Sequence, residues 1–508
     1  MRAFRVTALL LAGAAALLAQ PAGTISGTVL SIASGAALAG SSVTLAFADG
    51  SPVQTVTADR RGRYLFTGLT AGYYALRASR ANFLTGRFGQ KTWNHTGVTI
   101  ELAPGAAVTA DVKLHRLGAV SGVVLDENGE GFPNVTVQAV TADAKSLTGR
   151  VSSAGITDDR GAFRIAGLRP GRYFVTTAAS EMEDGTGYLP TYYPGVANRA
   201  EAQIVKVDLD SDTPGLRVQP VGGHLARLAG SVPAALKIRD AEVTVTLFRD
   251  EDSRQIIAGP GGQFVFAGIV PGRYTLVAEV RSAQGRLASY QSLDLLGDVE
   301  GLMVETAPAP DVQVRLSDEN GSAVSDPQIL VFLARVENAA RTAPVKAEAA
   351  GPGAYRAAGL MPGRWRFFVV ASESYALDAV RVGSSDALDG FVLQPGRPVT
   401  ATIRLARRAG LVRGQVTDAS GRLVVGVPVV CYPLDARNRA RLGGYRSGRT
   451  SVQGEYRFGG LPVGQYLVLA APLEEFDPEP QLDEWKSRAP AIEITGGREL
   501  SHDLRLLE

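Results

Sequence analysis

The chain has 508 residues, and its 52 basic and 50 acidic side chains give a formal net charge of only +2. This balance provides no broad positive field, so nucleic acid is not an expected partner. Glycine (58) and proline (27) make up about 17% of the chain, which is short of the 25 to 30% typical of disordered chains, and the length predicts three to five domains.

The first 20 residues have the pattern of a secretory signal peptide. Arg2 and Arg5 precede an apolar run over residues 6–18, which ends at small residues. Such a run is too short to span a bilayer, which needs about 20 residues. We therefore expect a signal peptide at residues 1–20, cleavage within residues 19–22, and no transmembrane anchor in the mature chain. The destination would be the periplasm, the outer cell surface or the extracellular space.

One motif recurs about every 100 residues: Gly-x-aromatic-x-apolar-x-Gly-Leu/Ile-x-x-Gly-x-Tyr/Trp. Its first glycines are Gly62, Gly161, Gly262, Gly353 and Gly454, spaced by 99, 101, 91 and 101 residues. Its last glycines and final aromatics are Gly72 with Tyr74, Gly171 with Tyr173, Gly272 with Tyr274, Gly363 with Trp365, and Gly464 with Tyr466. A gap-free match of this length in five places indicates tandem repeats.

The motif predicts two strands joined by a tight turn. Aromatic and apolar residues two positions apart, such as Tyr64 and Phe66, point to one face of a strand. The Gly-Leu-x-x-Gly stretch supplies turn residues. In the second strand Tyr74 and Leu76 share a face, whereas charged residues, including Glu279 of the third copy, take the other. One buried and one wet face is typical of an antiparallel sheet.

Further strands flank each pair. Opening strands are predicted at residues 25–30, 120–125, 312–316 and 411–417, and closing strands at residues 108–114, 399–405 and 500–506. Three opening strands run into acidic turns at Asp126, Asp318 and Asp418. We interpret them as hairpin turns, because the alternating ligands and distal glutamate of a calcium loop are missing. Helix signals are weak and predict at most short helical turns.

These patterns predict an all-β fold of five tandem Greek-key β-sandwiches, transthyretin-like or Ig-like, after the signal peptide. The expected sandwiches are residues 21–115, 116–220, 221–307, 308–406 and 407–508, of which the third and fourth carry degenerate copies. The sequence ends two residues after the last closing leucine, so we expect no anchor or further domain to follow it.

The repeat resembles the carboxypeptidase regulatory-like domain. The resemblance rests on opening strands such as residues 120–124 (Val-Ser-Gly-Val-Val), on the acidic hairpin, and on the Gly-Leu-x-Pro-Gly-x-Tyr block. It implies a transthyretin-like, seven-stranded sandwich, in a group that includes carbohydrate-binding-like and collagen-adhesin B-type folds. Binding and spacing are the roles that it implies, and fold membership establishes neither.

Two activities of related proteins are not expected here. No histidine has a glutamate three residues later, so the zinc centre of the namesake peptidases cannot form. No lysine lies in an opening strand, so the isopeptide cross-links of collagen-adhesin relatives are improbable.

The sequence does not predict an enzyme. Cys431 alternates with Val429 and Val427, which indicates a small core residue. The four histidines (His95, His115, His224 and His502) are too widely spaced for a structural zinc site. No nucleophile elbow or phosphate-binding glycine loop occurs. We therefore expect no catalytic residues, no metal and no cofactor.

The best binding candidates are aromatic residues in loops. Trp93, Tyr192 and Trp485 each lie 19 residues after the final aromatic of their copy, and Tyr188 and Tyr193 flank Tyr192. An aromatic face beside polar groups can stack on a sugar ring. Alternatively, these aromatics cap the sandwich or wedge between neighbours, and the fixed spacing favours that structural role.

Two functions therefore stay open. The first is a non-catalytic, exported binding protein that recognises polysaccharide or a cell-surface glycan through its loop aromatics. The alternative is a structural spacer or adhesive stalk that contacts an envelope protein. The excess of arginine over lysine and the alanine-rich leader suggest a bacterial source.

Overall fold

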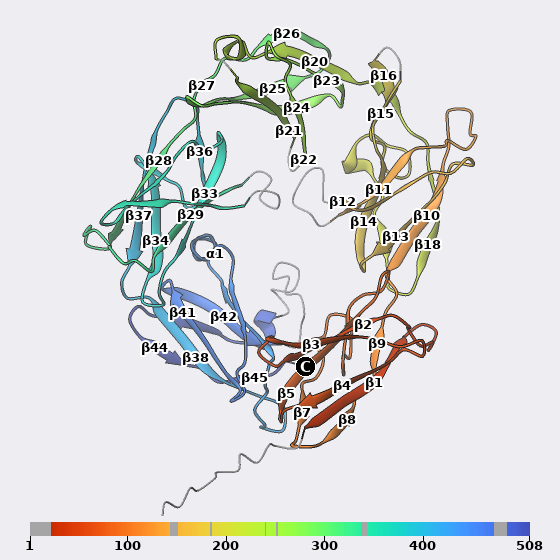
Figure 1. Ribbon diagram of the computed structural model, residues 1–508, viewed down its shortest axis with the longest axis vertical. Coiled ribbons are helices and arrows are strands. Elements are labelled where there is room, and N and C mark those ends of the chain that lie inside the picture. The colour runs from red at the N-terminus through yellow and green to blue at the C-terminus, as the bar shows by residue number, and fades with distance from the viewer. Residues whose placement is uncertain are drawn as a thin grey trace, which may run out of the picture. The chain divides into compact units, whose positions relative to one another are not determined.

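The computed structural model describes residues 22–142, 151–182, 185–238, 240–249, 252–336, 343–471 and 485–507 (Figure 1). The expected signal peptide lies outside this range. Strands are the dominant regular structure of the described residues, which confirms the all-β fold class. Their helical content is α1 (Ala436–Leu442), a helical turn at residues 485–488, and the 3₁₀ turns η2 (Arg199–Glu201) and η3 (Pro233–Leu236).

The chain divides into two compact units. The first contains the described residues up to Arg80 together with Thr85–Gln90 and Gly97–Leu114. The second contains Ala81–Leu84, Lys91–Thr96 and the described residues from His115 onward. Each unit is built of facing sheets, and we name each sandwich after its opening strand.

The first unit holds the β1 sandwich. One sheet contains β1 (Gly23–Ser31), β4 (Arg63–Leu69), β8 (Ala107–Thr109) and β9 (Val112–Leu114). The other contains β2 (Ser42–Phe47), β3 (Pro52–Thr57), β5 (Gly72–Ser79), β6 (Gly86–Arg87) and β7 (Ile100–Leu102).

The second unit continues with the β10 and β20 sandwiches. The β10 sandwich has one sheet of β10 (Gly118–Val124), β13 (Ala162–Leu168) and β18 (Asp212–Val218), and a second of β11 (Thr136–Thr141), β12 (Val151–Ile156), β14 (Gly171–Thr177) and β17 (Val205–Val207). A small third sheet contains β15 (Ser180–Glu181), β16 (Thr186–Tyr188) and β19 (Gly222–His224). The β20 sandwich pairs β20 (Ala226–Ser231), β23 (Gln263–Ile269) and β26 (Val299–Met303) with β21 (Glu242–Arg249), β22 (Asp252–Ile257), β24 (Gly272–Ser282), β25 (Gly285–Leu295) and β27 (Ala307–Pro308).

The β28 and β38 sandwiches complete the second unit. The β28 sandwich has a six-stranded sheet of β28 (Val312–Asp318), β31 (Glu348–Gly351), β32 (Ala354–Ala357), β34 (Ala376–Val382), β35 (Ser385–Asp386) and β37 (Val399–Ala406). Its second sheet contains β29 (Leu330–Arg335), β30 (Val345–Lys346), β33 (Gly363–Val370) and β36 (Phe391–Leu393). The β38 sandwich pairs β38 (Gly410–Thr417), β41 (Glu455–Leu461), β44 (Glu499–Ser501) and β45 (Leu504–Arg505) with β39 (Pro428–Pro433), β40 (Arg446–Arg449), β42 (Gly464–Ala470) and β43 (Ala491–Ile494).

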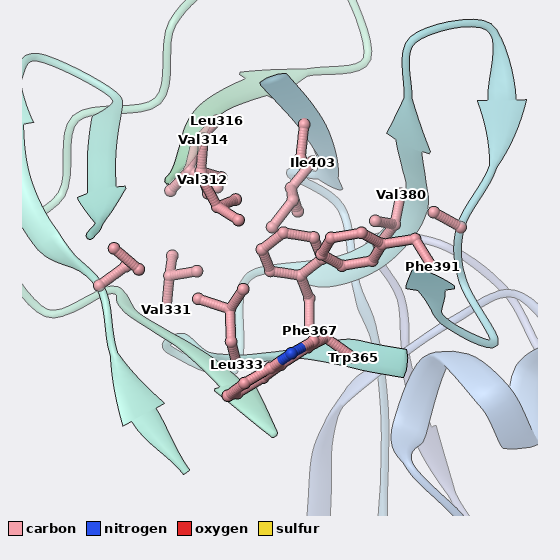
Figure 2. Packing of buried hydrophobic residues seen from close by; sticks show 14 of the residues in the cluster. Val312, Val314, Leu316, Val331, Leu333, Trp365, Phe367, Val380, Phe391 and Ile403 are labelled. Atoms are coloured by element: carbon pink, nitrogen blue, oxygen red, sulfur yellow. The ribbon is translucent and has the colours of Figure 1, made fainter. Parts of the chain in front are cut away.

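Each sandwich buries apolar residues between its sheets, as period-two patterns require. In the β28 sandwich, Trp365 and Phe367 of β33 and Phe391 of β36 belong to one buried cluster with the valines of β28 (Figure 2). The rings of Phe367 and Phe391 stack with centroids 5.0 Å apart. The alternation in the motif therefore correctly predicted which face is buried. The number of modules and their boundaries stay predictions.

The final aromatic of the motif closes the turn that precedes it. Its hydroxyl or indole N–H donates a hydrogen bond of 2.7 to 2.9 Å to the carbonyl oxygen four residues earlier. The pairs are Tyr74 with Thr70, Tyr173 with Arg169, Tyr274 with Val270, Trp365 with Met361, and Tyr466 with Pro462. Because phenylalanine has no donor, this bond explains why the position holds Tyr or Trp in all five copies.

A glycine in the opening strand decides how the closing strand runs beside it. Gly27, Gly122, Gly230 and Gly414 occupy this position, because each is the register partner of the motif's first aromatic. A Cβ on any of them would overlap a backbone carbonyl oxygen of the closing strand. The parallel pairing of opening and closing strands is interrupted at this point.

The fourth copy departs from this arrangement. Val314 takes the glycine's place opposite Tyr355. A valine side chain leaves no room for the approaching carbonyl, and β28 pairs with β37 without interruption from Val312 with Val399 to Asp318 with Leu405. The second edge of β37 pairs with β34, which widens the sheet.

The acidic turns are hairpin turns, as the sequence predicts. One carboxylate oxygen of Asp126 accepts the backbone N–H groups of Asn128 and Glu130 at 2.9 and 2.8 Å. Asp318 and Asp418 accept two backbone N–H groups in the same way. These carboxylates therefore stabilise their turns by accepting backbone N–H groups.

The expectation that Glu279 is solvated was wrong. Glu279 does lie on the face opposite Tyr274, but its side chain is only 5% exposed. The guanidinium of Arg281, at 2.7 Å, and that of Arg286, at 3.9 Å, cover it. The reason is the length of the β24–β25 hairpin, whose 11-residue strands carry these arginines beside the carboxylate.

Candidate functional site

The aromatics singled out in the second copy lie on the β10 sandwich, and each is half-buried. The hydroxyl of Tyr188 donates to a carboxylate oxygen of Glu127 at 2.8 Å, and its ring packs edge-on against Phe132 at 5.0 Å. The hydrogen bond raises the pKa of Tyr188, since it favours the neutral hydroxyl. Tyr193 packs against the core of the sandwich. Both side chains are therefore held in place.

Tyr192 covers the outer face of β14. Its ring packs edge-on against Phe174, with centroids 6.1 Å apart, and the guanidinium of Arg199 lies 4.7 Å from the centre of the Phe174 ring. Phe174 is buried. Tyr192 and Arg199 thus shield an apolar residue on the outside of the sheet, which favours the packing role that the sequence left open.

Trp485 takes a comparable place on the β38 sandwich. Its side chain is only 4% exposed and packs with Leu467 and Leu469 of β42 in a cluster separate from the main core. Leu467 follows Tyr466 as Phe174 follows Tyr173, so the two aromatics cover the same strand of their sandwiches. The 19-residue spacing therefore reflects shared packing at these two positions. Trp93 is half-buried and belongs to the segment Lys91–Thr96 of the second unit.

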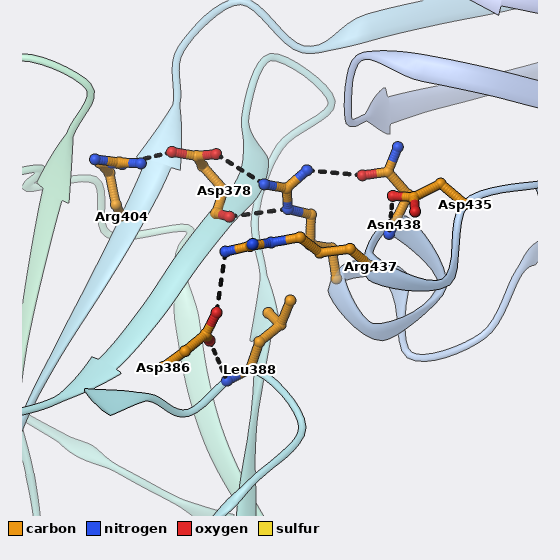
Figure 3. Close-up of polar contacts among 8 residues, drawn as sticks. Asp378, Asp386, Leu388, Arg404, Asp435, Arg437 and Asn438 are labelled. Carbon is orange, nitrogen blue, oxygen red and sulfur yellow. Dashed lines mark hydrogen bonds and ion pairs between the residues drawn. The ribbon is translucent and has the colours of Figure 1, made fainter. Parts of the chain in front are cut away.

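A second candidate site, which the sequence did not reveal, is a polar joint between the β28 and β38 sandwiches (Figure 3). Its centre is Asp378 of β34. The Nε of Arg441 donates to the Asp378 backbone oxygen at 2.8 Å, and its terminal nitrogen lies 3.2 Å from the carboxylate. Arg404 donates to the same carboxylate at 2.5 Å. The side chains of Arg441 and Asp378 are 18% and 28% exposed, so water screens this pair less than a surface pair.

Two more ion pairs flank this centre. Arg437 of α1 lies 3.0 Å from Asp386. Arg457 of β41 donates two hydrogen bonds to one oxygen of Glu373, at 2.9 and 2.6 Å. Backbone contacts accompany the second pair, since the N–H of Gly460 donates to the Glu373 carbonyl at 3.0 Å. All three carboxylates come from the β28 sandwich, and each meets an arginine of the β38 sandwich, whereas Arg404, the second partner of Asp378, belongs to the β28 sandwich itself.

Helix α1 presents two of these arginines, and local signals explain where it lies. Asp435 is its N-cap, with the carboxylate accepting the N–H of Asn438 at 3.2 Å. Gly443 ends it in the left-handed conformation, with φ of +69°. Between them, Ala440 packs against the core of the β28 sandwich. The sequence signal that could have located this helix is an Asp and a Gly separated by seven residues.

The described residues contain no cluster suited to binding a metal ion. No group of three or more His, Cys, Asp or Glu side chains there could hold a metal ion. Cys431 is fully buried in the core of the β38 sandwich, as predicted, and burial raises the pKa of its thiol to about 12. Such a thiol is inert.

The family comparison agrees with the resemblance seen in the sequence. Residues 24–115 and 119–209 match the family model of the carboxypeptidase regulatory-like domain. The chain therefore carries two tandem copies of this domain. They include the first two copies of the motif.

Two of the curated relatives are described as repeat-containing proteins. Serine-aspartate repeat-containing protein D of Staphylococcus aureus (strain Newman) is 25% identical over 296 residues, which cover 52% of this chain and 22% of the relative. Serine-aspartate repeat-containing protein F of Staphylococcus epidermidis is 28% identical over 165 residues, or 30% of this chain and 9% of the relative. The chain thus spans about a fifth or less of the length of these relatives.

Solved structures with a likeness to this chain include GBS52, the minor pilin of Streptococcus agalactiae. The match covers 39% of this chain and 95% of the pilin, with 14% identity and a TM-score of 0.23. At this score the likeness carries no argument about arrangement. Separately, none of the helices among the described residues has the length and apolar character needed to cross a membrane.

Proposed function

We propose that this chain is an exported, non-catalytic, multi-module protein that serves as a structural or adhesive stalk at the cell envelope. The observation that carries the proposal is the joint between the β28 and β38 sandwiches. A spacer must transmit position from one module to the next, whereas modules that only bind ligands independently need no such contact. Here three carboxylates of one sandwich meet three arginines of its neighbour.

The joint combines weak ion pairs with apolar packing. Exposed ion pairs contribute about 0.2 to 1 kcal/mol each, and the pairs of Arg437 and Arg457 are about half-exposed. The pair of Arg441 with Asp378 is better shielded. Ala440 adds apolar contact with the neighbouring core. Together these contacts favour one relative placement of the two sandwiches.

The comparisons support the proposal in kind. The relatives are described as repeat-containing proteins. We extend the repeat to five modules, at residues 21–115, 116–220, 221–307, 308–406 and 407–508, following the five copies of the motif. The signal peptide at residues 1–20 would direct export, and an envelope protein would be the partner.

Labelling of intact exporting cells tests the proposal. A chain with an epitope after residue 507 should be reached by antibody or added protease without permeabilisation, or after opening of the outer membrane alone. Cross-linking on such cells should then join it to an envelope protein. Signal confined to the cytoplasm would contradict the proposal.

The second candidate function is recognition of polysaccharide or a cell-surface glycan by the aromatics of the β10 sandwich. The observation in its favour is the fixed placement of Tyr188, whose hydroxyl and ring are both held while the residue stays half-exposed. A ring fixed in this way loses little entropy on stacking against a sugar. Tyr192 and Tyr193 of the same sandwich would complete the contacts there, and Trp93 would be a separate contact.

A glycan array with the full chain tests this second function. Binding that is lost in Tyr188→Ala and kept in Tyr445→Ala would support it. Tyr445 is the matched control, because it lies in the β38 sandwich, where it packs near Tyr432. An array without binding at any glycan would leave the stalk as the better account. Because Trp485 is only 4% exposed, we expect sugar-dependent changes in tryptophan fluorescence to come from Trp93.

A further inference from the structure

We infer that the sandwiches resist tension along the chain by a shear clamp of parallel strands, and that the β28 sandwich has the strongest clamp. This inference rests on the proposed stalk function, because a stalk transmits force between its two ends. The property concerned is the resistance of each sandwich to shear, and in the β28 sandwich Val314 is the residue that strengthens it.

The geometry of the clamp follows from strand direction. In every sandwich the opening strand pairs in parallel with the closing strand. Tension enters at the start of the opening strand and leaves at the end of the closing strand. Because the strands are parallel and adjacent, these two points lie at opposite ends of one hydrogen-bonded ladder. The force therefore slides the strands past each other and loads all ladder bonds together.

An antiparallel terminal pair would fail differently. Force would then act at one end of the ladder and open its bonds one after another. A net hydrogen bond is worth only about 0.5 to 1.5 kcal/mol, so sequential opening needs little force at any moment. Simultaneous loading raises the barrier to unfolding, and forced unfolding depends on that barrier rather than on equilibrium stability.

The ladders differ in length. The β28–β37 ladder runs through seven consecutive residue pairs. The ladder beside β1 is split into three and three pairs, and the one beside β38 into three and two. Register shifts break the ladders beside β10 and β20. A broken ladder yields in sections, so the uninterrupted one should withstand the highest force.

A single position accounts for the difference. Gly27 and Gly414 admit a backbone carbonyl of the closing strand, which turns out of the ladder at that point. In both interruptions an aspartate of the closing strand, Asp111 or Asp503, accepts an opening-strand N–H in place of backbone, at 2.7 and 2.9 Å. Val314 fills the space instead, and the ladder closes.

Pairing on the second edge of β37 reinforces the clamp. Strand β34 pairs with β37 from Ala376 with Ala406 to Val382 with Ala401. The closing strand is therefore held on both sides. The described residues of the other sandwiches show pairing of the closing strand with the opening strand alone.

Single-molecule force spectroscopy of the full chain, held at its two ends, tests the inference. We expect one unfolding event for each sandwich, with the event of the β28 sandwich at the highest force. Two matched variants assign the events. Trp365→Ala and Tyr466→Ala remove equivalent buried aromatics, each the last residue of its motif. Trp365→Ala should lower or abolish the highest-force event, and Tyr466→Ala should leave it unchanged.

The direction of pulling separates shear from general stability. Asn320 is exposed and lies just after β28, beside the end at which β37 leaves the ladder. Cys431, the only native cysteine, is buried, so a handle on Asn320→Cys is selective. Pulling between residue 320 and the C-terminal end peels the β28 sandwich and still shears the β38 sandwich. We expect the highest-force event to be lost and the β38 event to keep its force.

Three results would overturn the inference. They are persistence of the highest-force event in the peeling geometry, its loss in Tyr466→Ala, and its survival in Trp365→Ala. Because these measurements use the purified chain, they do not depend on where the protein resides. A failure of cell labelling would therefore disprove the envelope stalk while leaving the clamp standing, and the reverse also holds.

Discussion

The β28 and β38 sandwiches carry the same motif and the same aromatic turn closure, yet their closing strands differ. Tyr466 and Trp365 both donate to the carbonyl four residues earlier. Gly414 accompanies a closing strand split into β44 and β45, whereas Val314 accompanies the continuous β37. A difference in side-chain volume at one opening-strand position thus separates a broken ladder from a complete one.

The difference extends to the joint. The continuous β37 offers a second edge on which β34 pairs, and β34 carries Asp378, the centre of the polar joint. The copy that has Val314 in place of glycine thus also carries Asp378 of the joint. What looks like degeneration in the sequence has a structural use.

The largest expected effect comes from removing the final aromatic. Tyr466 is fully buried, so Tyr466→Ala should destabilise the β38 sandwich by about 3 to 5 kcal/mol. Trp365→Ala should do the same to the β28 sandwich. Hydrogen exchange of β42 and β33 peptides in the full chain measures the free energy of opening. A loss below about 1 kcal/mol would show that the assigned strand faces are wrong.

The opening-strand glycine can be tested directly. In Gly414→Ala the new methyl group would overlap the His502 carbonyl, so we expect a loss of about 1 to 3 kcal/mol in the β38 sandwich. Gly448→Ala is the matched control, because its methyl group would meet a Phe458 ring carbon at an ordinary 3.5 Å. Urea unfolding followed by hydrogen exchange compares the two. Equal losses would mean that the carbonyl contact is not what selects glycine.

The turn-closing hydrogen bond should have a smaller effect. Tyr466→Phe keeps the buried ring and removes the donor to the Pro462 carbonyl at 2.8 Å. We expect a loss of about 1 kcal/mol, the usual net value of one hydrogen bond. Hydrogen exchange of β42 peptides measures this loss in the free energy of opening. A loss as large as that of Tyr466→Ala would indicate that the hydroxyl, rather than ring burial, dominates.

The joint should respond to charge removal without global unfolding. Asp378→Asn combined with Glu373→Gln weakens two of the three ion pairs. The half-exposed pair of Glu373 is worth at most about 1 kcal/mol. In this double variant we expect the unfolding transitions of the β28 and β38 sandwiches to separate, as measured by calorimetry. High salt should have a similar effect on the native chain, because it screens the same ion pairs. Asp294→Asn is the control, because its partner Arg273 lies within the β20 sandwich. Unchanged unfolding transitions in the double variant would show that the joint does not couple the unfolding of the two sandwiches.

The smallest effect concerns acid. Hydrogen bonds from Ser420 and Arg422 hold the pKa of Asp418 well below its ordinary value of 3.8. A lowered pKa in the folded state means that the carboxylate stabilises the turn above about pH 4, and that this contribution is lost as the pH falls through the folded pKa. Asp418→Asn should therefore reduce the acid sensitivity of the β38 sandwich between pH 5 and pH 2. An unchanged pH profile would contradict this role.

The sequence was sufficient for the fold because its signals are local. Alternation at period two marks the buried faces, and paired glycines mark turns, so β4, β5 and their equivalents could be predicted. The acidic turns were also recognisable, because Asp126 and its equivalents bond to backbone only two and four residues away. Helix α1 was missed, although Asp435 and Gly443 bracket it, because its seven residues lack an apolar stripe.

The candidate sites were harder to predict because they depend on distant residues. Arg441 meets Asp378 across 63 positions of the chain, and Arg457 meets Glu373 across 84. No spacing rule connects such pairs. The burial of Trp485 likewise depends on the outer face of β42, whose leucines the alternation alone did not assign to a second cluster.

Amide hydrogen exchange along the closing strands tests the central claim most directly. If Val314 closes the ladder that glycine interrupts elsewhere, amides of β37 should exchange slowly in an unbroken run, and the region around His502 and Asp503 should exchange faster than its flanking strands. Equal protection across both closing strands, or a fast-exchanging gap within β37, would contradict the account.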